Sequence, residues 1–475
     1  MTSTTDRAHS FADDALGDLD AVGVAEAISA GRLSAAEAVD AAIARAETVE
    51  PRLNAIVTPD FDRARDTARS SATGVFGGVP TFIKDNTGVA GLPTGHGSAA
   101  LLDPPRALAD DPFTTQLLST GAINLGKSSL PEFGFNATTE FQVAEPTRNP
   151  WHTDYSCGAS SGGSAALVAA GVVPFAHAND GGGSIRIPAA ACGLVGLKFT
   201  RGREVPDAQA GAMPVNIVSN GIVSRSVRDS AAFLAAVDRH TPNRALNRVG
   251  LVEGPSDRRL RVGLILSSLR SAPDDETRSA VLAIAERLEK DGHEVVEVPL
   301  PVDEAFVDHF LHYWAMLGFS MHRFGGRLLH AKYDRSLNDD LTKGLARDFL
   351  RRPWRTPGAI RALKRSESIY QQSFRDNAVD VVLSPVVGST TPLLGHLSPA
   401  AGYEVMLPRL LDYAAYTPAN NAAGGPAISL PLAQTSDGRP IGIHFSATHG
   451  DERTLLELAF ELEQSMGFAR ITATT

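Results

Sequence analysis

The stretch Gly158-Ala-Ser-Ser-Gly-Gly-Ser164 is followed, after an apolar run, by Asp180-Gly-Gly-Gly-Ser-Ile-Arg-Ile-Pro188. Consecutive glycines reach conformations that other residues avoid, so their backbone N–H groups can face one small space. Such donors stabilise the oxyanion that forms when a carbonyl carbon is attacked. A glycine-rich turn that only lets two segments pass closely would give the same glycine pattern. The serine after the run favours the first interpretation, with Ser184 as nucleophile and oxyanion donors at Gly181, Gly182, Gly183 and Ser184.

Three positions, Lys84, Ser160 and Ser184, follow one another in an order that resembles the amidase signature family. Members carry a lysine after a short apolar strand, here Val79-Pro-Thr-Phe-Ile-Lys84, and then the two serine clusters. The similarity covers nearly the whole chain. Its further markers are the helical region near residues 20–48, Gly126-Lys-Ser-Ser-Leu-Pro-Glu-Phe133, Pro146-Thr-Arg-Asn-Pro-Trp151 and Pro440-Ile-Gly-Ile-His-Phe445.

This resemblance implies an amidase that hydrolyses a linear or cyclic carboxylic amide to a carboxylate and an amine or ammonia. Neutral Lys84 would take a proton from Ser160, which would take one from Ser184 as that serine forms an acyl-enzyme. The family pattern places a cis peptide bond at Ala159–Ser160. It requires no metal ion and no cofactor.

The lysine can act as a base only when it is neutral. Its pKa in free solution is about 10.4, so the protein has to lower it, and burial does this by penalising the charged form. Phe82 and Ile83 precede Lys84 and supply apolar surroundings.

Other residues are expected to support the reaction. The resemblance implies that Ser161 hydrogen-bonds Lys84 and that Asp180 and Arg186 hold the nucleophile loop. The segment His312–Phe319 predicts either an apolar acyl pocket or a plain core helix. The candidate substrate-binding residues are Asn136, Trp314, Met316 and Phe319.

The implied fold is α/β, the amidase signature fold, with a large mixed β-sheet flanked by helices on both faces. We expect one domain over residues 1–475, in three regions. They are an N-terminal helical region at about 15–70, a signature core at about 75–205, and a variable substrate-cleft and C-terminal part at about 206–475. Ser34 and Glu37 have capping-box spacing and predict a helix that ends near Val49.

The resemblance implies a small-molecule amide substrate, and composition disfavours nucleic-acid and membrane partners. The chain has 54 acidic and 44 basic residues, a net charge of -10, which disfavours nucleic acid. No apolar run approaches the roughly 18 residues of a membrane span. The N-terminal residues 1–14 lack an apolar signal core, so we expect a cytoplasmic protein whose two cysteines are free thiols. The resemblance also suggests a homodimer.

A rival hydrolase interpretation comes from Gly158-Ala-Ser-Ser-Gly162, which matches the G-x-S-x-G nucleophile elbow of α/β-hydrolases. Ser160 would then be the nucleophile of an esterase, with Asp412 and His444 as candidate partners. The preceding Thr153–Cys157 is mostly polar, so the strand that should lead into an elbow is missing.

Two alternatives keep the predicted fold. A glutaminase subunit of a tRNA-dependent amidotransferase commonly has glutamine after the loop arginine, where this chain has Ile187. That difference favours a stand-alone amidase, a group that includes hydrolases of the 6-aminohexanoate cyclic dimer. A non-catalytic scaffold is disfavoured because Lys84, Ser160 and Ser184 are all retained.

Three further patterns are less informative. Gly121-Ala-Ile-Asn-Leu-Gly-Lys-Ser128 matches a phosphate loop by letter, but Ala122–Leu125 predicts a strand and Pro131 follows too soon for a long helix. Cys157 adjoins the first serine cluster but lacks the histidine partner of a catalytic cysteine. The basic residues within 341–365 indicate either a solvated helical face or an anion-binding surface.

Overall fold

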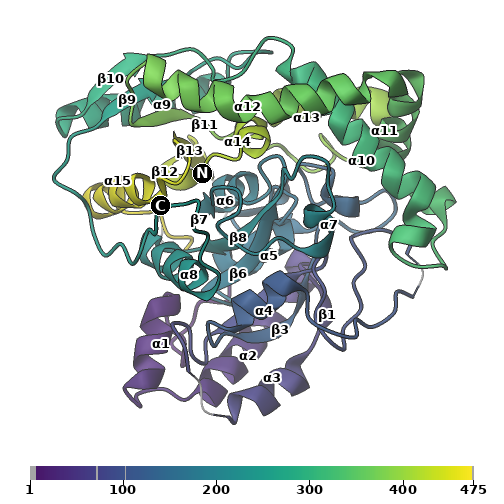
Figure 1. Cartoon of the computed structure of the whole chain (residues 1–475). Coiled ribbons are helices and arrows are strands. Elements are labelled where there is room, and N and C mark those ends of the chain that lie inside the picture. The colour runs from purple at the N-terminus through teal and green to yellow at the C-terminus, as the bar shows by residue number, and fades with distance from the viewer. Residues whose placement is uncertain (1–6, 71–72, 102, 473–475) are drawn as a thin grey trace.

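The computed structural model describes residues 7–70, 73–101 and 103–472. Its centre is an eight-stranded mixed sheet (Figure 1). β9 pairs in parallel with both β10 and β11, and the remaining neighbours are antiparallel. In sheet order the strands are β10 (Glu294–Glu297), β9 (Arg261–Leu264), β11 (Val381–Pro385), β13 (Pro440–Ala447), β12 (Ala427–Gln434), β7 (Val195–Lys198), β8 (Ser219–Ser224) and β6 (Phe175–Asp180).

A second, three-stranded sheet lies beside the β6 edge of the large one. Its order is β1 (Ile56–Pro59), β3 (Ile123–Ser128) and β2 (Pro80–Lys84). The Thr81 hydroxyl of β2 donates to the Phe175 carbonyl of β6 over 3.1 Å. β2 therefore reaches the edge of the large sheet, which carries Lys84 to the end of β6. A short hairpin of β4 (Arg148–Asn149) and β5 (His152–Ser156) stands apart from both sheets.

Helices cover both faces of the large sheet, and β13 shows why. Its alternate residues Ile441, Ile443 and Phe445 belong to the main hydrophobic core, together with Leu458 of α15. The residues between them face the other side, where a Cβ atom on Gly442 would lie 2.4 Å from the Ala190 Cβ of α6. This period of two follows from the pleat of a strand. A mixed sheet with helices on both faces confirms the predicted α/β architecture.

The N-terminal helices lie at the bottom of Figure 1, and α9 to α13 run across the top. The α-helices are α1 (Ala21–Ser29), α2 (Ala35–Leu53), α3 (Phe61–Ala68), α4 (Pro112–Leu118), α5 (Gly162–Ala169), α6 (Arg186–Cys192), α7 (Ala208–Gly211), α8 (Val227–His240), α9 (Asp275–Lys290), α10 (Phe306–Leu328), α11 (Asp340–Arg351), α12 (Thr356–Asp376), α13 (Tyr403–Tyr413), α14 (Pro418–Ala423) and α15 (Glu452–Met466).

Two local predictions can be compared with this structure. The capping box is present, since Glu37 N–H donates to Ser34 Oγ and Ser34 N–H donates to the Glu37 carboxylate. The helix extends to Leu53 rather than ending near Val49, and Asn54 caps it in the left-handed conformation. The phosphate-loop match lies largely in β3, a strand, as expected, and only the short turn Glu132–Gly134 follows it.

Within the described ranges, every helix is too short or too polar to cross a bilayer. Residues 1–6, on which the expectation about secretion partly depends, lie outside the described residues. The division into three regions stays a prediction.

Candidate active site

Lys84 is the last residue of β2, a strand whose residues are all buried. Its Nζ lies 2.8 Å from Ser160 Oγ, 3.0 Å from Ser161 Oγ and 2.6 Å from Asn179 Oδ1. Burial lowers the pKa of Lys84 to about 7, and the charges of Asp180 and Asp207 oppose this shift only in part. Because all three hydrogen-bond partners are uncharged, a large share of the lysine is neutral at neutral pH.

Ser160 and Ser161 follow each other in the turn between the β4–β5 hairpin and α5. The Ala159–Ser160 peptide bond is cis, as the resemblance predicted. Ser161 is the residue before the first turn of α5 and is fully buried, whereas Ser160 reaches the wall of a cavity. The two adjacent hydroxyls therefore meet the same lysine, and only Ser160 also faces open space.

Ser184 lies in the short loop between β6 and α6. It lines the same cavity as Ser160, together with Gly181 and Gly182. The structure thus brings all three predicted catalytic residues to one place, with Lys84 behind Ser160. The conformation of this loop requires glycine at position 183, because φ is +130° there and a Cβ atom would lie 2.2 Å from Thr417 Oγ1.

One of the four predicted oxyanion donors is already engaged. The Gly183 N–H donates to Asp180 Oδ1 over 2.7 Å, so it turns toward the buried side of the loop. The prediction that Gly183 serves as an oxyanion donor therefore conflicts with this geometry. A sequence pattern cannot show which N–H groups a neighbouring carboxylate takes. Gly181, Gly182 and Ser184 remain candidates.

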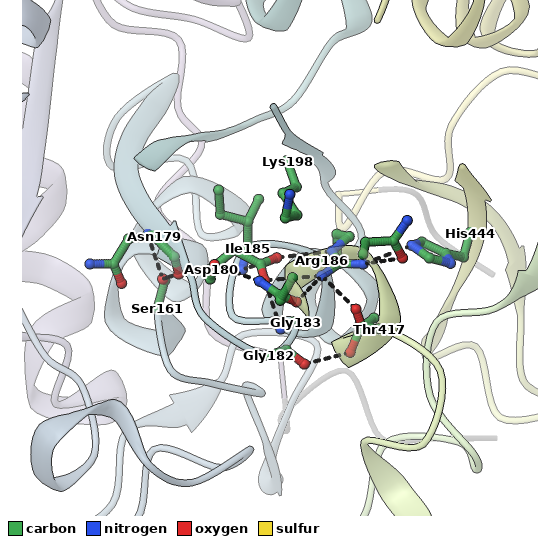
Figure 2. A network of polar contacts seen from close by, with 12 residues as sticks. Ser161, Asn179, Asp180, Gly182, Gly183, Ile185, Arg186, Lys198, Thr417 and His444 are labelled. Atoms are coloured by element: carbon green, nitrogen blue, oxygen red, sulfur yellow. Dashed lines mark hydrogen bonds and ion pairs between the residues drawn. The ribbon is translucent and has the colours of Figure 1, made fainter. Parts of the chain in front are cut away.

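Asp180 and Arg186 hold the two ends of this loop (Figure 2). The carboxylate and the guanidinium are 2.9 Å apart and fully buried. Burial alone would raise the pKa of Asp180, but the charge of Arg186 and its hydrogen bonds hold that pKa well below its usual value. Arg186 also donates to Asn421 Oδ1 at 2.7 Å and to the Thr417 carbonyl at 3.1 Å, which ties the loop to α14.

The cavity in front of the serines has a volume of about 120 Å³. Trp314 and Asn136, two of the predicted substrate-binding residues, line it, although the Asn136 amide also donates to the Leu397 carbonyl over 2.8 Å. Its apolar wall is formed mainly by Phe133, Phe135, Met213, Ile217, Phe310, Trp314 and Leu317.

Two of the predicted substrate-binding residues lie elsewhere. Met316 packs in the same apolar cluster as Trp314 but does not line the cavity. Phe319 stacks on Phe349 with ring centroids 4.8 Å apart. Met316 and Phe319 are both on α10, where residues three or four apart share a face. The face that includes Trp314 therefore continues with Phe310 and Leu317, which the sequence interpretation missed. Counting by three and four from Trp314 would have found them.

The partners required by the rival elbow are dispersed. Asp412 pairs with Arg270 and is half-exposed, whereas His444 is buried between Arg186 and Ser384. The strand before Gly158 belongs to the small hairpin rather than to the large sheet. These positions do not form a Ser-His-Asp arrangement around Ser160.

Both cysteines are buried and free. Burial raises the pKa of Cys157 to about 12, which makes its thiol unreactive. Across the described ranges, no group of three or more His, Cys, Asp or Glu side chains is arranged to hold a metal ion.

Known proteins share this arrangement of sequence and fold. The Amidase family model matches residues 37–456. A Mycobacterium tuberculosis protein (strain ATCC 25618 / H37Rv) named "Putative amidase AmiC" is 49% identical over 471 residues, 98% of each chain. The 6-aminohexanoate-cyclic-dimer hydrolase of Paenarthrobacter ureafaciens is 34% identical over 481 residues, 94% of each chain.

A solved structure agrees with the fold. The structure of 6-aminohexanoate cyclic dimer hydrolase complexed with substrate superposes with a TM-score of 0.85 at 30% identity, covering 96% of this chain and 98% of that one. This confirms the predicted amidase signature fold. The family model and these relatives each span most of the chain, and they show that it belongs to the amidase signature family.

Proposed function

We propose that this amidase hydrolyses its substrate through an acyl-enzyme on Ser184, with Ser160 and Lys84 as the proton relay. The observation that carries the proposal is the 2.8 Å contact between Lys84 Nζ and Ser160 Oγ, behind a cavity that Ser160 and Ser184 both line. A buried lysine with a pKa near 7 is suited to general-base catalysis at neutral pH.

The acylation step moves two protons and exchanges one bond at carbon. Ser184 Oγ bonds to the amide carbonyl carbon as its proton passes to Ser160 Oγ and the Ser160 proton passes to Lys84 Nζ. The carbon–nitrogen bond then breaks, and the relay returns a proton to the departing amine nitrogen. Water then attacks the carbonyl carbon of the Ser184 ester through the same relay, which releases the carboxylate and restores the Ser184 hydroxyl.

Stabilisation of the oxyanion is assigned to the nucleophile loop. The backbone N–H groups of Gly181, Gly182 and Ser184 are the proposed donors, since Asp180 takes the Gly183 N–H. Removal of one such donor typically costs about 10²–10³ in kcat. The bond from Thr417 Oγ1 to the Gly182 carbonyl, at 2.7 Å, helps to fix the direction of the peptide groups in this loop.

The cavity favours an amide with an uncharged, apolar acyl part. Aromatic and aliphatic side chains make most of its wall. The polar side chains that reach it are Asn86, Asn136, Ser160, Asn179, Ser184 and Asp207. Polar substrates such as glutamine would leave their charged groups against apolar surface, which costs free energy. This supports a stand-alone amidase over the glutaminase subunit. Cleavage of the 6-aminohexanoate cyclic dimer itself is the first candidate activity, by similarity to the relatives so named.

The decisive experiment is labelling with a fluorophosphonate, followed by peptide mapping and an amide-hydrolysis screen. An adduct on Ser184, absent from Ser184→Ala, together with turnover of an apolar amide, is the expected result. An adduct on Ser160 alone would support the esterase alternative. Glutamine turnover only in a copurified complex would support the glutaminase subunit, and no adduct with no turnover would support the scaffold.

Two expectations stay predictions, namely the cytoplasmic location, which rests on the N-terminal sequence, and the homodimer, which rests on the resemblance. Size-exclusion chromatography with light scattering checks the second, because a dimer of this 50.1 kDa chain has twice the mass of the monomer.

A further inference from the structure

Asn179 occupies a place in the active site that the sequence interpretation left unassigned. It is the residue before Asp180 in β6, it lines the catalytic cavity, and only 5% of its surface is exposed. Its Oδ1 lies 2.6 Å from Lys84 Nζ, the shortest of the three hydrogen bonds made by that nitrogen.

The direction of the hydrogen bonds around Lys84 follows from what each partner can do. A serine hydroxyl has one donor and two acceptor positions. Ser161 Oγ donates to the Asn179 carbonyl at 3.2 Å and accepts the Asn179 N–H at 3.3 Å. Its one remaining acceptor position must take an N–H from Lys84. Asn179 Oδ1 can only accept, so it takes a second N–H.

We propose that Asn179 is a positioning residue that aims the lone pair of neutral Lys84 at Ser160. A neutral amine has two N–H bonds and one lone pair. Ser161 and Asn179 take the two N–H bonds, which leaves the lone pair facing the Ser160 hydroxyl. The inference rests on the proposed function, in which Ser160 gives its proton to this nitrogen.

The same three oxygens also fit the product of proton transfer. When the O–H bond of Ser160 breaks and a new N–H bond forms on Lys84, the ammonium has three N–H groups for three acceptors. The nitrogen therefore need not rotate during the reaction. The opposite end of the residue is also held, because the Lys84 backbone N–H donates to His177 Nδ1 over 3.2 Å.

The absence of charge on Asn179 is the second part of the argument. A carboxylate in its place would stabilise the ammonium and hold the proton on the lysine. The other titratable or charged groups near Lys84 are Asp180 and His177 on β6, Asp207 before α7, and Lys127 of β3 with its partner Asp85. Asn179→Asp leaves all of them in place and changes only the group that touches Nζ.

The test is a pair of pH titrations on wild-type protein and Asn179→Asp, with Asn243→Asp in an outer loop as the matched control. Lysine labelled with ¹³C at Cε reports the protonation of Lys84 directly. The Lys84 signal is assigned by its loss in Lys84→Met. Hydrolysis rates are measured over the same pH range. We expect the lysine midpoint and the acidic limb of the rate profile to rise together by about one unit or more in Asn179→Asp, with at least about a fivefold loss at pH 7 that recovers at high pH.

Two results would overturn the inference, namely an unchanged lysine midpoint in Asn179→Asp, or a rate at pH 7 equal to that of wild type. Asn179→Leu removes the acceptor without adding charge. Its hydrolysis rate should be at least about tenfold lower than that of wild type at every pH, without recovery at high pH. If Asn179→Asp does not fold, Asn179→Leu serves as the second variant. A kcat of Asn179→Leu equal to that of wild type would also contradict the proposal. The NMR midpoint does not depend on turnover, so failure of the proposed function can be distinguished from failure of this inference.

Discussion

Two polar clusters meet at the end of β6, and their chemistry differs. The lysine cluster consists of Lys84, Ser160, Ser161 and Asn179, and the arginine cluster of Asp180, Arg186, Asn420 and Asn421. Asn179 and Asp180 are neighbours in the strand and belong to different clusters, since successive side chains of a strand point to opposite sides. The lysine cluster has only uncharged partners, whereas the arginine cluster contains a carboxylate 2.9 Å from the guanidinium.

This difference shows how one loop can be both rigid and reactive. A buried ion pair with further hydrogen bonds keeps both of its charges, so it fixes the shape of the loop without taking part in proton transfer. A buried lysine among neutral oxygens keeps its proton weakly, and its pKa falls to about 7. The choice of asparagine at one position and aspartate at the next separates the two roles.

Removing the reactive groups should have the largest effect. Ser184→Ala and Lys84→Met should each lower kcat by about 10³-fold or more, because the nucleophile or its base is lost. Steady-state kinetics on the best amide measures this. Far-UV circular dichroism should show an intact fold in both variants. Substantial turnover by Ser184→Ala would contradict the assigned nucleophile.

Breaking the arginine cluster should instead lower stability. Arg186→Met leaves the Asp180 carboxylate buried without its ion partner, and such losses cost about 3–5 kcal/mol. Denaturant unfolding should show this loss. The double variant Asp180→Asn with Arg186→Met removes both charges and should regain part of it. Equal stability of wild type and Arg186→Met would mean that the ion pair does not hold the loop.

The pH dependence of the reaction sharpens the same comparison. Burial lowers the pKa of Lys84 from its free-solution value to about 7, so the neutral base is present above pH 7 and lost below it. Below pH 7, kcat/KM should therefore fall about tenfold for each unit, as for a single required base. A profile measured from pH 5.5 to 9 checks this. If kcat/KM instead kept rising toward pH 10, the lysine would be charged in the resting enzyme at neutral pH.

Much of the site could be predicted from the sequence because its chemistry is local in the chain. The glycines, Ser160, Ser184, Asp180 and Arg186 lie within two short segments whose spacing identifies the family. The mixed sheet with helices on both faces followed from the same resemblance. The capping box of α2 was predictable from Ser34 and Glu37 alone, since its bonds join residues three apart.

The remaining features depend on contacts between distant parts of the chain. Asn179 acquires its role from Lys84, which lies on a strand of the other sheet. The direction of the Gly183 N–H depends on the Asp180 carboxylate, and no residue pattern encodes that direction. The cavity face of α10 is set by how the helix packs, so Trp314 lines the cavity whereas Met316 and Phe319 do not.

A smaller effect should separate the two faces of α10. Trp314→Ala removes an aromatic wall of the cavity and should raise KM for an apolar amide by about tenfold, since pocket contacts of this size contribute about 1–3 kcal/mol. Phe319→Ala should leave KM within about twofold and lower stability instead, through the lost contact with Phe349. Michaelis–Menten kinetics with both variants tests this. Equal effects on KM would show that the cavity wall is assigned wrongly.

The smallest effect is expected at Cys157, which adjoins the lysine cluster in sequence and takes no part in it. Its thiol is fully buried, donates to the Thr147 carbonyl over 3.4 Å, and has a pKa raised by burial to about 12. Because the thiolate is the nucleophilic form, native protein should resist iodoacetamide, and Cys157→Ala should keep kcat within about twofold. If iodoacetamide alkylated Cys157 rapidly and substrate prevented this, Cys157 would instead be a second nucleophile in addition to Ser184. The contrast with Lys84 is instructive, since burial suppresses the reactivity of an acid such as this thiol and promotes that of a base.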